Sequence, residues 1–421
     1  MSVKVEKGNE FEKNSLLLFS LMMGANIFNY LFQIVLGHLL SVGDYGILNT
    51  LMSMVTIMSI PNLLLVMVMA KYTATYSVCG KKNNIIALMF FGVKVASVLA
   101  VLLVFCGFGM ADYISQIFNI GEKNYFIIIT YVVGVTLIVS IAIGALQGLK
   151  RFFDYGIQNL INVGCKLIFS IFLVYAGLKL YGVLIALLIG IILSGIYAYY
   201  KIIKLLGKPD KKSSIMLPYL EIVKYSIGTF VAQACITVMT NGDILLVKAF
   251  FSETETGIYS SAMVLGKIAM YIAGAVVAAL FPMVAEAYAK KQDTRNLLLK
   301  ALLYGGGSSI ICSLGLVFLG HFFISILFGE RYIQAFQYLP YVCLFIVPLT
   351  FLTVIMNFVL AIGKVSFFSI SVLISCILAV TLITYEHSSV EMMLVVIGVV
   401  LFITAAVNIA VAYKQCNDCK C

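Results

Sequence analysis

The chain has 421 residues and a mean hydropathy of +1.08; 62% of its residues are hydrophobic and only 11% are charged. Soluble domains carry about 25% charged residues, so the composition excludes a water-soluble protein and indicates a membrane protein. The net charge of +10 comes from basic residues dispersed among short loops, which argues against nucleic-acid binding.

Long apolar runs recur through the chain without strand-like alternation, so they predict membrane helices rather than the strands of a barrel. We expect twelve transmembrane helices. In chain order they cover residues 15–39, 45–70, 85–110, 125–146, 157–178, 181–200, 222–250, 258–284, 297–321, 335–362, 365–384 and 392–413. The first run is too long for a cleavable signal peptide, and no small-residue cleavage pattern follows it.

The basic residues predict the orientation of these helices. Of the 28 lysines and arginines, twenty fall on the side that holds the N-terminus, four near the other side and four within spans. Cytoplasmic loops carry the excess of basic residues. Both termini are therefore expected in the cytoplasm.

Two segments of the chain resemble each other. "LSVGDYGILNTLMS" from Leu40 aligns with "FSETETGIYSSAMV" from Phe251 at an offset of 211, which pairs Gly46 with Gly257. A second pair of similar segments, "LQGLKRFF" and "LAIGKVSFF", follows the fourth and tenth spans. The order predicts two six-helix lobes in parallel orientation, as transporters use: residues 1–204 and 221–421, with a lysine-rich cytoplasmic linker at 205–220.

The same segments resemble a known family. "LLSVGDYGILNTL", "GALQGLKRFFDYGIQNLI" and "NGDILLVKAFFSETETGIYSSAMVL" are similar to the polysaccharide-biosynthesis (O-antigen and exopolysaccharide) flippases, a branch of the superfamily that also holds multidrug extruders and the lipid II flippase. The resemblance implies a V-shaped, MATE-like pair of six-helix bundles with a central cavity and alternating access. It further implies a polyprenyl-diphosphate-linked oligosaccharide as cargo, in the bacterial cytoplasmic membrane, with membrane lipids and polysaccharide polymerase or export machinery as partners.

Three lysines lie about nine residues inside expected spans: Lys94, Lys166 and Lys267. A charge at the bilayer centre costs roughly 2.5–3.5 kcal/mol, so such residues usually face a cavity. We expect the three ammonium groups to bind the diphosphate of a lipid-linked cargo. The alternative is that each lysine stem carries its ammonium to the headgroups separately.

One acidic residue, Asp243, lies inside an expected span, beside Gly242. It is a candidate coupling or gating residue: a site for Na⁺ or H⁺, or a partner of Lys267 or Lys248 that separates during transport. The alternative is an interfacial aspartate at a helix bend, hydrogen-bonded to Asn241 or water. The sequence leaves the coupling ion open.

Polar and kink-forming residues supply further candidates. Asn26, Asn29 and Gln33 share one face of the first span and could hydrogen-bond the cargo sugars, or join helices. Pro61 and Pro348 lie inside spans, where each frees a carbonyl and is expected to kink its helix. Kinks can serve gating or packing.

Other chemistry is scarce. The cysteines are scattered in or beside spans, except for a C-terminal group at Cys416, Cys419 and Cys421, which is one ligand short of a closed zinc site. Nucleotide-binding motifs are absent, so we expect a gradient or the membrane potential, not ATP bound by this chain, to supply any drive. We expect no cofactor, no metal and no enzymatic activity. The alternatives to an oligosaccharide flippase are a lipid II flippase or cation-coupled drug antiporter of the same superfamily, and, less favoured for want of a large polar loop, a membrane polysaccharide polymerase.

Overall fold

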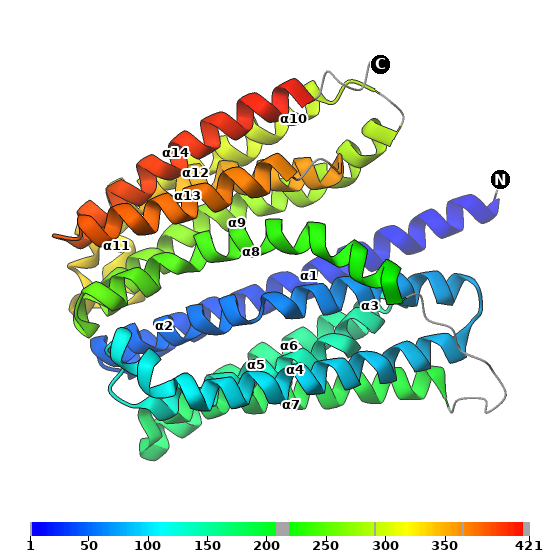
Figure 1. Ribbon diagram of the computed structural model, residues 1–421, viewed down its shortest axis with the longest axis horizontal. Coiled ribbons are helices and arrows are strands. Elements are labelled where there is room, and N and C mark those ends of the chain that lie inside the picture. The colour runs from blue at the N-terminus through cyan, green and yellow to red at the C-terminus, as the bar shows by residue number, and fades with distance from the viewer. Residues whose placement is uncertain (1, 208–218, 290–291, 364–365, 416–421) are drawn as a thin grey trace. The chain divides into compact units, whose positions relative to one another are not determined.

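The computed structural model describes residues 2–207, 219–289, 292–363 and 366–415, and within these ranges all regular structure is helical (Figure 1). Most of the expected linker 205–220 and the C-terminal cysteines lie outside the described residues. The expectation of an all-α membrane protein is confirmed.

Seven helices precede the linker: α1 (Ser2–Leu39), α2 (Val42–Met58), α3 (Ile60–Val78), α4 (Lys82–Ile117), α5 (Lys123–Gly148), α6 (Phe152–Leu173) and α7 (Lys179–Leu206). Seven more follow it: α8 (Tyr219–Phe250), α9 (Glu253–Ala289), α10 (Arg295–Ala301), α11 (Gly307–Leu327), α12 (Ala335–Ala361), α13 (Ser366–Tyr385) and α14 (Val390–Gln415). When α2 with α3, and α10 with α11, are taken as single broken spans, these described helices correspond in order to the twelve expected ones.

Length and composition show which of these helices can cross a bilayer. Among the described residues eight helical segments qualify, or nine if the bent pair α2–α3 counts as one span. One of the eight, Phe152–Leu206, contains both α6 and α7. The chain turns within it at Gly177, whose φ of 90° suits a residue without Cβ. The protein is therefore a multi-pass membrane protein.

The packing divides the chain into two compact units. The N-terminal unit comprises Met1–Leu40 and Met54–Ser226, and the C-terminal unit comprises Ser41–Ser53 and Ile227–Cys421. Most of α2 thus packs with the C-terminal unit, a feature that the division 1–204 and 221–421 does not contain. The V shape and central cavity stay predictions.

In the N-terminal unit, α5 packs against α3, α4 and α7, while α6 packs against α7 and α1. Glycines allow α5 to approach α3 closely. A Cβ on Gly144 would lie 2.6 Å from the carbonyl oxygen of Val66, and one on Gly148 would lie 2.5 Å from that of Ala70. Small residues at such positions let helix backbones pack tightly in lipid, where no hydrophobic effect drives helices together.

In the C-terminal unit, α12 packs against α9, α11 and α14. Helix α12 continues as one α-helix through Pro348. Proline cannot donate to the carbonyl four residues earlier, which here belongs to Leu344. Helix α14 comes close at that carbonyl, because a Cβ on Gly398 would lie 3.3 Å from its oxygen. Pro348 therefore lies where α12 and α14 pack together.

The two segments that align in the sequence have the same local structure. Ser41 precedes α2, and its Oγ accepts a hydrogen bond from the backbone N–H of Asp44 at 3.0 Å. Ser252 precedes α9, and its Oγ accepts the equivalent bond from Glu255 at 3.2 Å. Both serines therefore cap the N-terminus of a helix in the same way.

The aligned glycines of these segments touch each other within the C-terminal unit. A Cβ on Gly46 would lie 2.7 Å from the backbone nitrogen of Gly257. A Cβ on Gly257 would collide with the carbonyl oxygen of Val42. The starts of α2 and α9 therefore cross at a point that only glycine allows.

Candidate functional site

Lys166 is a buried cation in the middle of α6. Only 8% of the residue is exposed. Its Nζ donates a hydrogen bond to Asn29 Oδ1 on α1 at 2.6 Å and lies 4.2 Å from the centroid of the Phe32 ring. An amide oxygen and an aromatic face both attract an ammonium group, but neither carries a negative charge to neutralise it.

The helices around Lys166 explain its placement. Helix α6 packs against α1 on one side and α7 on another. A Cβ on Gly190 of α7 would lie 2.8 Å from the carbonyl oxygen of Asn162 and 3.2 Å from the backbone nitrogen of Lys166. Because α7 approaches the backbone here so closely, the lysine stem extends toward α1, where Asn29 and Phe32 receive it.

The ion pairs formed by the described residues leave Lys166 without a carboxylate. Ammonium carries three donors, and Asn29 is the one hydrogen-bond acceptor that the described part of the chain provides. A buried unpaired charge is costly unless something else compensates it. Lys166 is thus a strong candidate for contact with an anion.

A second polar cluster lies in the C-terminal unit, between α8 and α9. Asp243 is 3% exposed, and its Oδ2 accepts a hydrogen bond from the Tyr259 hydroxyl at 2.7 Å. Its Oδ1 has no hydrogen-bond partner among the described residues. A buried carboxylate oxygen without a donor is a place where a proton or a small cation would be stabilised.

Lys267 belongs to the same cluster, two turns along α9 from Tyr259. Its Nζ donates to Asn241 Oδ1 at 3.3 Å, and its charge attracts Asp243 without a direct ion pair. The Asn241 amide nitrogen donates to the carbonyl of Thr237 at 3.0 Å, which holds the amide oxygen toward Lys267. Of the two lysines expected near Asp243, Lys267 interacts with it through its charge alone, and a coupling role for these residues stays a prediction.

Lys248 has a different partner. It lies at the end of α8, fully buried, with its Nζ 3.6 Å from Glu253 Oε1 at the start of α9. This ion pair joins the two helices across the turn between them. Among the ion pairs of the described residues, Lys248 is joined to Glu253 rather than to Asp243.

The remaining lysine of the expected set, Lys94, lies apart from Lys166 within the same unit. It is on α4, which packs against α5 and α3, whereas Lys166 is on α6, which packs against α7 and α1. Its side chain is exposed. That the three ammonium groups form one pocket stays a prediction.

The three polar residues expected on one face of α1 differ in exposure and contacts. Asn29 binds Lys166, Asn26 is exposed, and Gln33 is half-buried. Pro61 lies in the first turn of α3, where α2 and α3 are bent by 42°. The bend that Pro61 predicts is present, and the gating roles of Pro61 and Pro348 stay predictions.

A buried carboxylate in the N-terminal unit escaped the sequence reasoning. Asp154, in the first turn of α6, is 1% exposed. It forms ion pairs with Arg151 at 2.7 Å and with Lys201 of α7 at 3.1 Å, and it accepts a hydrogen bond from Tyr197. Two cations compensate this carboxylate, so it joins α6 to α7 and leaves no negative charge for a cationic ligand.

Phe32 and Tyr259 were also missed, and Asn241 was expected as a partner of Asp243, whereas it accepts a hydrogen bond from Lys267. Each of these residues either lies far along the sequence from the charged group that it contacts or belongs to an apolar stretch of helix, so the sequence gives no sign of the contact. A search for aromatic and amide residues at the depth of each expected buried charge would have found them. Among the described residues, no three His, Cys, Asp or Glu side chains cluster as a metal site requires.

Solved structures with this fold are membrane transporters. An inward-facing multidrug-resistance MATE transporter of the MOP superfamily has a TM-score of 0.77 at 14% identity, covering 96% of this chain and 98% of that one. An outward-facing multidrug-resistance MATE family transporter of the MOP superfamily has a TM-score of 0.66 at 14% identity, covering 97% of this chain and 96% of that one. A MOP superfamily transporter from Pyrococcus furiosus, in which a reversed polarity of the binding pocket suggests a different function, has a TM-score of 0.63 at 15% identity, with coverages of 97% and 95%.

No curated protein matches the sequence. The family model described as polysaccharide biosynthesis protein matches residues 11–288. This match covers more than half of the chain, and the fold agrees with it. The chain therefore belongs to the polysaccharide biosynthesis protein family and has the fold of the MATE transporters of the MOP superfamily.

Proposed function

We propose that the protein is a flippase that moves a polyprenyl-diphosphate-linked oligosaccharide across the bacterial cytoplasmic membrane, with both termini in the cytoplasm. Membership of the polysaccharide biosynthesis family and the MATE-like fold support transport of a glycan precursor. The observation that carries the choice of an anionic cargo is the buried ammonium of Lys166, which no carboxylate among the described side chains compensates.

A diphosphate complements that ammonium well. It offers several acceptor oxygens for the donors that Asn29 leaves unused, and lysine is a good point charge for phosphate. The polyprenyl chain can stay in lipid while the headgroup and sugars contact polar groups such as Asn29. Cargo binding would thus replace an unfavourable buried charge with an ion pair.

A cation-exporting antiporter fits the N-terminal unit less well. A site for cationic drugs needs negative charge, and the buried carboxylate found there, Asp154, is already paired with Arg151 and Lys201. The reversed pocket polarity of the P. furiosus transporter, which suggests a different function for that protein, is a precedent for variation of pocket charge on this fold. The charge balance around Lys166 favours an anion.

Asp243 is the residue that we assign to ion coupling. Its orphaned Oδ1 can take up a proton or help to hold Na⁺, and the nearby charge of Lys267 responds to that change. The membrane potential also favours outward movement of an anion, by about 2.3 kcal/mol per charge and 100 mV. The sequence shows no nucleotide-binding motif, so these are the sources of energy that the proposal uses.

Substitution of Lys166 tests the cargo assignment. The protein is reconstituted in vesicles that contain polyprenyl diphosphate bearing a fluorescent disaccharide, and translocation is followed by loss of quencher access. We expect Lys166→Gln to lower the rate at least about tenfold, the scale of one lost charge-assisted contact, and Lys166→Arg to retain more of it.

Lys204→Gln, a change of an exposed lysine near the end of α7, is the matched control and should transport normally. Transport at the wild-type rate by Lys166→Gln would overturn the assignment. So would export of a cationic dye by the wild-type protein in place of the lipid diphosphate.

A further inference from the structure

Lys94 shares an exposed face of α4 with large apolar side chains. Val101, Phe105 and Phe108 follow it at offsets of 7, 11 and 14 residues, which places all four on one stripe of the helix. The three apolar residues are 68%, 78% and 52% exposed. A cation therefore stands at the end of a long apolar strip on the surface of the N-terminal unit.

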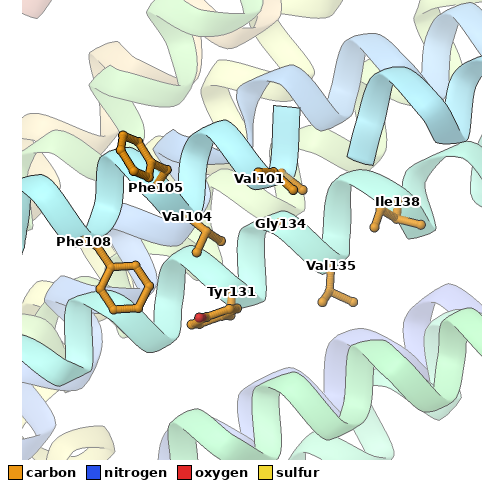
Figure 2. Close-up of a pocket in the computed structure, with 9 residues that line it drawn as sticks. Val101, Val104, Phe105, Phe108, Tyr131, Gly134, Val135 and Ile138 are labelled. Carbon is orange, nitrogen blue, oxygen red and sulfur yellow. The ribbon is translucent and has the colours of Figure 1, made fainter. Parts of the chain in front are cut away.

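The strip borders a groove between α4 and α5. Figure 2 shows Val101, Val104, Phe105 and Phe108 from α4 along one side, and Tyr131, Val135 and Ile138 from α5 along the other. The groove is deepened by Gly134 of α5, which has no side chain and packs against Ala100 of α4. A Cβ added to Gly134 would lie 3.3 Å from the Cβ of Ala100. The rings of Phe108 and Tyr131 meet edge to face, with centroids 6.3 Å apart.

The size of the groove suits one hydrocarbon chain. Its volume is about 430 Å³. Its lining on α4 runs from Ala100 to Phe108, about 12 Å of helix axis at a rise of about 1.5 Å per residue, which is long enough for part of one extended acyl chain. It begins about 10 Å along the helix axis from Lys94, at a rise of about 1.5 Å per residue.

The charge of Lys94 selects among the lipids that could fill this groove. Among the described residues Lys94 forms no ion pair, and its neighbours on the exposed face, Phe90 and Val98, are apolar. Long side chains in helices lean toward the helix N-terminus, so we expect the ammonium toward the Lys82 end of α4, away from the groove. A lipid with its phosphate on the ammonium would therefore extend its chain along the strip.

We propose that Lys94 and the α4–α5 groove bind one anionic phospholipid of the surrounding bilayer, with the phosphate on the Lys94 ammonium and one acyl chain along the groove. This assigns Lys94 to bilayer lipid rather than to the cargo. The site is independent of the proposed transport function, because it uses neither Lys166 nor Asp243.

The absence of tryptophan from the sequence allows a direct test. Phe105→Trp places the only indole of the chain beside the groove. The variant is reconstituted in vesicles of phosphatidylcholine and phosphatidylglycerol in which one or the other lipid carries brominated chains, and quenching gives the relative affinity of the two lipids. We expect phosphatidylglycerol to be preferred about fivefold, the effect of one lysine near a phosphate.

Three comparisons decide the result. Adding Lys94→Gln should bring the preference close to one, while adding Lys94→Arg should keep it. Phe318 of α11 is 80% exposed, and Phe318→Trp should report no preference for phosphatidylglycerol, whether position 94 is lysine or glutamine. The proposal fails if Phe105→Trp reports no preference for phosphatidylglycerol, or the same preference after Lys94→Gln.

A prenyl lipid is the competing occupant. Unbrominated polyprenyl phosphate added at a few mole per cent should leave the quenching by brominated phosphatidylglycerol unchanged. Recovery of the fluorescence at that concentration would overturn the proposal, because the groove would then bind the prenyl chain in preference to the bilayer lipid.

Discussion

In each of the two units a lysine donates a hydrogen bond to an asparagine, but the charged groups around the two lysines differ. In the N-terminal unit, Lys166 of α6 donates to Asn29 of α1 at 2.6 Å and no described carboxylate pairs with it. In the C-terminal unit, Lys267 donates to Asn241 at 3.3 Å and also attracts Asp243. One lysine is left to bind an anion, and the other is held in a pair that a proton or cation can change.

The internal repeat relates the positions of the two asparagines. The offset of 211 that aligns Gly46 with Gly257 pairs Asn29 with Thr240, the residue before Asn241, so the two asparagines occupy neighbouring positions of the repeat. The lysines come from different helices, α6 and α9. Each half of the repeat therefore carries an asparagine near this position, but the lysine that donates to it comes from a different part of the half.

The largest effect is expected at the glycine contact. A Cβ on Gly257 collides with the backbone of Val42, which cannot rotate away, so Gly257→Ala should cost about 3 kcal/mol of stability, the upper end for an overpacked site. Gly46→Ala, with a Cβ 2.5 Å from the carbonyl oxygen of Glu253, should also destabilise. Thermal unfolding in detergent measures both.

Gly109→Ala is the matched control, because no atom lies within 4 Å of the added Cβ. It should leave stability unchanged or raise it slightly, since alanine favours a helix more than glycine does. Equal melting temperatures for Gly257→Ala and Gly109→Ala would show that the starts of α2 and α9 do not cross at these glycines.

A smaller effect is expected when the C-terminal cluster is made to resemble the N-terminal one. Asp243→Asn removes the carboxylate and leaves Lys267 with amide partners alone. We expect transport driven by an ion gradient to fall about tenfold, as for loss of one coupling contact, while exchange without a gradient continues. Vesicle transport with and without imposed Na⁺ or H⁺ gradients separates the two.

Asp112→Asn, at an exposed carboxylate paired with Lys123 at 3.0 Å, serves as the control for that measurement. It should transport as the wild type does under every gradient. An Asp243→Asn protein that responds fully to the gradient would remove Asp243 from the coupling mechanism.

The sequence predicts much of the fold because hydropathy and repeats are properties of the chain itself. Helix order, the bend at Pro61 and the matched segments around Gly46 and Gly257 all follow from local pattern. The packing of Ser41–Ser53 with the C-terminal unit does not, because an apolar helix carries no sign of which neighbours it will meet.

The candidate site was predictable only in part. The depth of Lys166 and the polar face that includes Asn29 can both be read from spacing, but residues 137 apart give no signal that they pair. Asp154 was missed because it precedes the expected span, and its compensation by Lys201 requires the antiparallel packing of α6 and α7.

The most direct test of the uncompensated lysine uses the same change at both asparagines. Asn29→Asp would give Lys166 a carboxylate of nearly the same shape, and Asn241→Asp would add one to Lys267, which already faces Asp243. Binding of polyprenyl diphosphate is measured by equilibrium titration in lipid nanodiscs. We predict that Asn29→Asp weakens binding at least about tenfold, the effect of neutralising one charged contact, and that Asn241→Asp changes it much less. Wild-type affinity in Asn29→Asp, or an equal loss in both variants, would contradict the account.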